Sequence, residues 1–99
     1  MLFDQINREL ELAERHLMVL RAVVERGPIG ILKLAEETGM PTHKVRYSLR
    51  VLEQEQLIKP SSSGAVPGDA VEQFMSDFES DICDVISKAA RIREICKPL

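Results

Sequence analysis

Five side chains between positions 43 and 50 have the chemistry needed to contact a DNA duplex. They are His43, Lys44, Arg46, Tyr47 and Arg50. Lys and Arg bind phosphate oxygens, and Arg can also address a guanine edge through two hydrogen bonds at once. A tyrosine adds a phosphate hydrogen bond or an apolar contact. This cluster therefore predicts a surface that reads double-stranded DNA.

The cluster falls on one face of a predicted helix. Val45, Leu49 and Leu52 recur at helical spacing and form the opposite, apolar face. Thr42 is placed to cap this helix, because its hydroxyl can accept a hydrogen bond from a free backbone N–H. The alternative is that Lys and Arg are simply ordinary polar choices for an exposed helix face.

A second, shorter helix precedes the first and favours the DNA interpretation. Ile31, Leu34 and Ala35 make one apolar stripe, and Thr38-Gly39 ends it, since glycine accepts the left-handed conformation common after a helix C-terminus. The two helices with a tight turn between them are typical of a helix-turn-helix DNA reader.

The stretch LAEETGMPTHKVRYSLRVLEQEQLIKP resembles the core of winged-helix transcriptional regulators, the broad group that includes the multiple-antibiotic-resistance and arsenic-repressor families and many small archaeal regulators. The resemblance spans about 17–68. It implies that Thr42, His43, Lys44, Arg46, Tyr47 and Arg50 lie on the recognition helix, and that the terminal helices dimerise. It specifies neither an operator nor a small-molecule effector.

The expected wing departs from the pattern of those regulators. A strand is predicted at 57–59, a turn at 60–64 and a short return strand at 65–67 that contains a proline. The tip has no Lys or Arg. Only Lys59 and the hydroxyls of Ser61, Ser62 and Ser63 are available for a DNA contact, so binding is expected to rest on the recognition helix.

Two long amphipathic helices are predicted at the ends of the chain. From about position 69 to 96, apolar residues alternate four and three apart, as in a heptad seam sustained for almost four repeats: Val71, Met75, Phe78, Ile82, Val85, Ala89, Ile92 and Cys96. Acidic residues dominate the first part of this helix and basic residues the last. This order suits the helix dipole, and it also suits an antiparallel partner helix. The N-terminal stripe is Phe3, Ile6, Leu10, Ala13, Leu17, Leu20 and Val24.

These patterns predict one mainly α domain over 1–99. Residues 15–68 form the winged helix-turn-helix core, and 1–14 and 69–99 are helical extensions for a homodimer. The dimer residues are expected to be Phe3, Ile6, Leu10, Val71, Met75, Phe78, Ile82, Val85, Ala89 and Ile92. In the alternative, the two long helices pack against each other within one chain.

Composition narrows the function further. The net charge is −3, which argues against nonspecific coating of nucleic acid, so the DNA attraction must be local. No apolar run is long enough to cross a membrane and no leader pattern is present, so a cytoplasmic location without a membrane partner is expected.

No catalytic or metal site is expected, and no cofactor. Cys83 and Cys96 lack metal-ligand spacing and are interpreted as small apolar residues in a helical interface, with a redox-sensing thiol as the alternative. His16 and His43 have no nucleophile or acid partner nearby in the sequence, and His16 is expected to be solvated.

The chain is thus predicted to be a homodimeric, sequence-specific transcriptional regulator rather than an enzyme. The alternative is a winged-helix protein-interaction module within a transcription complex or another multisubunit assembly.

Overall fold

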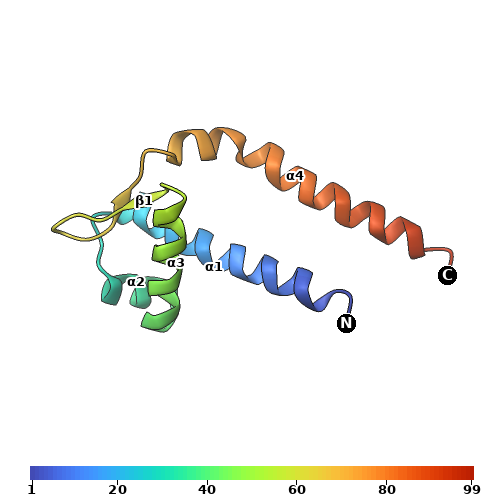
Figure 1. Cartoon of the computed structure of the whole chain (residues 1–99), viewed down its shortest axis with the longest axis horizontal. Coiled ribbons are helices and arrows are strands. Elements are labelled where there is room, and N and C mark those ends of the chain that lie inside the picture. Colours follow the sequence, from blue (N-terminus) through green and yellow to red (C-terminus); the bar gives the residue numbers. More distant parts are fainter.

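The protein is mainly helical, with one small antiparallel sheet (Figure 1). A computed structural model describes all of residues 1–99. In chain order the elements are α1 (Asp4–Arg26), α2 (Ile31–Thr38), α3 (Thr42–Gln54), β1 (Ile58–Lys59), β2 (Val66–Pro67) and α4 (Val71–Cys96). The predicted mainly α chain with two long terminal helices is confirmed.

One apolar core holds the second half of α1, α2, α3 and the start of the hairpin together. Its nine buried residues all fall between positions 19 and 58: Val19, Leu20, Val23, Ile29, Leu34, Val45, Leu52, Leu57 and Ile58. Burying each such side chain stabilises the fold by about 1.5–3 kcal/mol relative to exposing it. The helices of this core are therefore fixed relative to one another.

The turn between α2 and α3 is tight and hydrogen-bonded. Gly39 takes the predicted left-handed conformation, with φ +71°, and its N–H donates to the Ala35 carbonyl at 2.9 Å. The predicted cap at Thr42 is wrong. Pro41 is the capping residue, because its carbonyl accepts the first helical hydrogen bonds from the N–H groups of Lys44 and Val45. Thr42 begins α3 without a side-chain capping bond.

The hairpin is shorter than predicted. β1 pairs with β2 in the register Ile58 to Pro67 and Lys59 to Val66, which leaves Leu57 outside the strand. Ala65 instead exchanges two backbone hydrogen bonds with Ile29, at 3.1 and 2.8 Å. This third strand-like contact ties the hairpin to the segment after α1, and the local sequence did not predict it.

The terminal helices project away from the core. Figure 1 shows that α1 and α4 have opposite chain directions. α1 begins, and α4 ends, at the end of the molecule where both termini lie. The radius of gyration is 16.0 Å, against about 13 Å for a compact domain of this length. No residue of α4 is buried, and none of the helices is long and apolar enough to span a membrane.

Gly64 offers a test of the hairpin's attachment to the core. It has φ +125°, and a Cβ built there lies 2.6 Å from the backbone carbon of Ile29. We expect Gly64→Ala to lower the free energy of unfolding by at least about 2 kcal/mol, because both the backbone conformation and the space exclude a side chain. Gly30→Ser is the control, since a Cβ at Gly30 meets nothing within 4 Å and serine is a good helix cap. Urea unfolding followed by circular dichroism measures both, and equal stabilities would contradict this attachment.

Candidate nucleic-acid interface

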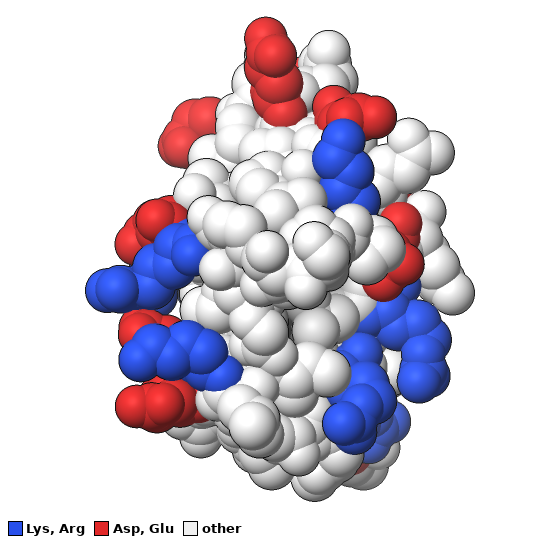
Figure 2. Space-filling view, turned by 90° about the vertical axis from the view of Figure 1, so that its left-hand side faces the viewer, with Lys and Arg blue, Asp and Glu red and all other residues white.

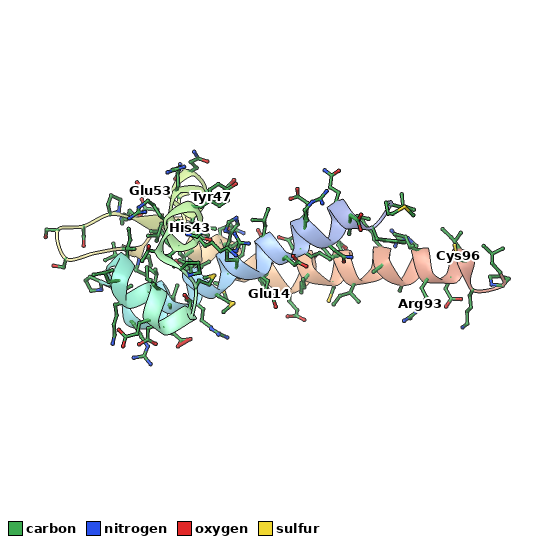
Figure 3. All side chains as sticks on the ribbon, turned by 90° about the horizontal axis from the view of Figure 1, so that it is seen from below. Glu14, His43, Tyr47, Glu53, Arg93 and Cys96 are labelled. Atoms are coloured by element: carbon green, nitrogen blue, oxygen red, sulfur yellow. The ribbon has the colours of Figure 1, made fainter.

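Helix α3 has one buried face and one face open to solvent. Val45, Ser48 and Leu52 are buried, and Leu49 is half-buried on the same side. Of the residues predicted to meet DNA, Thr42 is half-buried, and the others on this helix are exposed: His43, Lys44, Arg46, Tyr47 and Arg50. Figure 3 places His43 and Tyr47 at the packed end of the molecule, far from Arg93 and Cys96 near the end of α4.

The three basic residues of α3, Lys44, Arg46 and Arg50, carry charges that no acidic side chain of the chain neutralises through an ion pair. The basic residues beside α2 differ. Arg26 pairs with Glu37 at 3.3 Å, and Lys33 lies 3.9 Å from a carboxylate oxygen of Glu37. Figure 2 shows the packed end of the molecule. Basic side chains alternate with acidic ones on one flank, and on the other flank the basic side chains form a group. Lys44, Arg46 and Arg50 are named the α3 basic face below.

A shallow, open cleft lies along one edge of this face. Its volume is about 460 Å³, and it is lined by Ile31, Arg46, Leu49, Arg50, Glu53 and Gln54. Two guanidinium groups and one carboxylate share it. Arg46 and Arg50 are one turn apart on α3, so both guanidinium groups can reach the phosphates of one nucleic-acid strand that lies along the cleft.

A polar contact crosses the packing between α1 and α3. The Nδ1 of His16 lies 2.7 Å from the Oγ of Ser48, and the His16 ring is 5.7 Å from the Tyr47 ring, centroid to centroid. The expectation that His16 is solvated is wrong, because α1 crosses α3 at this level and half-buries the imidazole. Sequence reasoning also missed Ser48, although its place between Val45 and Leu52 on the apolar stripe marked it as inward-facing.

The environment of His16 lowers its pKa below the usual 6.5. Partial burial is the main cause, since it disfavours the charged imidazolium, and the positive charge of Arg15 adds to it. His16 is therefore neutral near pH 7, and its nitrogen can hold the Ser48 hydroxyl. Because Ser48 is on α3, this bond helps to fix how the helix is rotated.

The hairpin offers less to DNA than its sequence suggested. The Nζ of Lys59 lies 2.9 Å from the Oδ1 of Asp69, so this charge is already paired. At the tip, the Ser61 hydroxyl donates to the Gly64 carbonyl at 2.6 Å and accepts from the Ser63 N–H at 3.2 Å. Among the hydroxyls predicted to be available, that of Ser61 is thus engaged in the turn.

Cys83 and Cys96 are free and exposed within the chain. Nowhere do three or more His, Cys, Asp or Glu side chains gather in a way that could hold a metal ion. Comparison with protein families and with curated proteins finds no match to this chain. The geometry of the chain itself therefore carries the functional argument.

The His16 contact predicts a pH dependence of stability. As the pH falls below about 6.5, the unfolded chain takes up a proton at His16 that the folded chain resists, so folding loses stability. We expect His16→Gln, which keeps an amide to bond Ser48, to lose less free energy of unfolding than the parent between pH 7.5 and pH 5. Urea denaturation at the two pH values measures this difference. Equal losses in parent and variant would mean that His16 has no shifted pKa.

Proposed function

We propose that this chain is a winged helix-turn-helix protein that binds double-stranded DNA as a homodimer and regulates transcription, with α3 as the recognition helix. The observation that carries the proposal is the α3 basic face: three unpaired cations on the exposed side of the second helix of a helix-turn-helix. Helices of this kind enter the major groove and contact bases and phosphates.

The order and packing of the elements support this proposal. α2, the Gly39 turn and α3 follow one another as in helix-turn-helix readers, and β1 and β2 come next as a small wing. α3 is held by its apolar face and by the Ser48–His16 bond. A recognition helix needs such support, since base contacts depend on a fixed orientation.

The charges set the strength of binding that one copy can reach. Lys44, Arg46 and Arg50 supply at most about three phosphate or base contacts, on a chain whose net charge is −3. Lys59 adds little, because Asp69 already pairs with it. One copy is therefore expected to bind weakly, and two linked copies far more tightly, since the second contact becomes intramolecular.

The exposed terminal helices support a dimer. Phe3, Ile6, Leu10, Met75, Val85, Ala89 and Ile92 are exposed, and Val71, Phe78 and Ile82 are only half-buried. The chain exposes 7345 Å², whereas a compact monomer of 11.2 kDa exposes about 5,700 Å². The excess is larger than the roughly 800 Å² that each partner buries in a standard interface.

A second candidate function is a protein-interaction module of the same fold. The Lys59–Asp69 ion pair and the uncharged wing tip favour it, because they remove the basic wing that many DNA readers use. In that case the exposed α3 face would dock on an acidic protein surface. DNA binding at low salt distinguishes the two functions.

The first test of the DNA function is a triple variant of the α3 basic face. We expect Lys44→Ala, Arg46→Ala and Arg50→Ala together to weaken duplex binding by several kcal/mol, because each contact is worth about 1–3 kcal/mol. The variant should also flatten the dependence of affinity on salt. Fluorescence anisotropy with labelled genomic DNA from around the protein's own gene measures both effects.

The matched control removes the same charge from the terminal helices. Arg8→Ala, Arg91→Ala and Lys97→Ala together should leave DNA affinity nearly unchanged, because these exposed residues lie on α1, on α4 and just beyond it. If both triple variants lost affinity equally, binding would be a matter of net charge and not of α3. If the parent bound no duplex at low salt, the interaction module would replace the DNA function.

The wing gives a second test. We expect Lys59→Ala to reduce DNA affinity less than Arg46→Ala does, because Lys59 is paired with Asp69 and Arg46 is not. Anisotropy titrations of the two single variants at the same salt concentration measure the ranking. A larger loss from Lys59→Ala would place the main DNA-facing surface on the hairpin.

A further inference from the structure

An apolar groove lies between α1 and the start of α4. Its volume is about 370 Å³, and its apolar lining is Leu17, Leu20, Val24, Phe74, Met75 and Phe78, with Arg21 and Glu25 also lining it. This interhelical groove continues the packed core toward the free ends of the helices. A second opening of about 440 Å³ lies farther along, lined in part by Phe3, Ile92 and Cys96.

The two helices do not close this space themselves. No hydrogen bond or ion pair joins α1 to α4. Apolar side chains on both helices remain exposed to solvent, for example Leu10 of α1 at 46 % and Met75 of α4 at 58 % exposure. Apolar faces this long are costly in water, so a further element is needed to cover them.

We propose that the occupant of the interhelical groove is α4 of a second copy, lying antiparallel to α4 with the twofold axis beside Cys83 and Asp84. This proposal rests on the homodimer of the proposed function and specifies its orientation and register. The heptad seam of α4 allows such a pair, because the spacing of its apolar residues is the same in both chain directions. Each seam residue then meets a defined seam residue of the other copy.

The sizes of the opposed side chains favour the antiparallel register. Reflection about the axis places Val71 opposite Cys96 and Ile82 opposite Val85. It also places the large Phe78 opposite the small Ala89, and Met75 opposite Ile92. The four layers then differ less in volume than those of a parallel dimer. A parallel dimer would instead stack Phe78 on Phe78 and Ala89 on Ala89, which leaves one layer crowded and another empty.

The charges beside the seam point the same way. In the antiparallel register Glu72 lies beside Arg93 of the second copy, and Asp81 beside Lys88, each offset by two residues from the level that the seam pairs define. Residues flanking a seam form the interhelical ion pairs that select orientation. In a parallel dimer Lys88 would face Arg93, two like charges. All four side chains are exposed and free of other ion pairs within the chain.

This register also fills the groove. Ile92 and Ala89 of the second copy fall at the level of Met75 and Phe78, which line the interhelical groove between α1 and α4. Ile95 of the second copy falls within one helical turn of the level of Phe74. Ile95 is 74 % exposed in its own chain, and this position gives it an apolar site. The bundle would thus contain α1 and α4 of both copies.

Charge substitution at Lys88 separates the two orientations. Lys88→Glu puts like charges opposite Asp81 in the antiparallel dimer, so the dissociation constant should rise roughly 2–10-fold, as expected for two exposed pairs. In a parallel dimer the same change would face Arg93 and tighten the dimer. The double variant Asp81→Lys with Lys88→Glu should restore the parent value. Sedimentation equilibrium measures all three proteins.

Cross-linking tests the register directly. In a chain carrying Cys83→Ser and Cys96→Ser, we expect the double variant Met75→Cys with Ile92→Cys to form disulfide-linked dimers under mild oxidation. Each single variant should stay unlinked, because identical positions then lie about 25 Å apart along the helix. Circular dichroism of the oxidised and reduced proteins checks that the helices persist.

The remaining outcomes overturn the proposal. Linked dimers from Met75→Cys alone would show a parallel pair, and a stable dimer without any cross-link would place the interface elsewhere. A parent chain that sediments as a monomer at micromolar concentration would exclude the dimer altogether. DNA binding of the cysteine-free parent, measured separately, shows whether the DNA function survives such a result.

Discussion

The packing of the second half of α1 across α2 and α3 is the interaction on which the rest of the structure depends. Val19 and Val23 of α1, Leu34 of α2 and Val45 of α3 are fully buried at this crossing. They bring three short apolar stripes into one core, and a short helix such as α2 is not stable in water without such burial. The same crossing turns the Lys- and Arg-bearing side of α3 outward.

The His16–Ser48 contact is a polar contact inside the packing of α1 against α3. A buried hydroxyl without a partner costs free energy, and the imidazole nitrogen of His16 supplies that partner at 2.7 Å. Apolar contacts tolerate small rotations of a helix, whereas a hydrogen bond fixes direction. The contact therefore links the stability of α1 to the orientation of the face proposed to bind DNA.

The terminal helices relate to the core in a different way. α1 begins about four turns before its first buried residue, and α4 ends far beyond the hairpin that precedes it. A small domain has too little surface of its own to cover two such helices. In the proposed dimer they would cover each other, and they would hold two copies of α3 at a fixed separation. Weak binding by each copy would then add up at two half-sites.

The sequence by itself determined the local elements, because their signals are local. Heptad spacing predicted α4, and Gly39 predicted the end of α2. The exposure of Lys44, Arg46 and Arg50 followed from the apolar positions on the other side of α3. In each case, helical periodicity and the conformational preferences of glycine act over a few residues.

Only the tertiary structure decided how distant segments meet. His16 and Ser48 are on separate helices, and neither segment alone indicates that they form a hydrogen bond. The Ile29–Ala65 bridge and the Lys59–Asp69 ion pair likewise join residues whose partners depend on chain path. Pro41, and not Thr42, is the capping residue of α3, because the backbone path after Gly39 determines which carbonyl accepts the first helical hydrogen bonds. Such contacts depend on the packing of the whole core, so local patterns determine which faces are available and the fold determines what each face contacts.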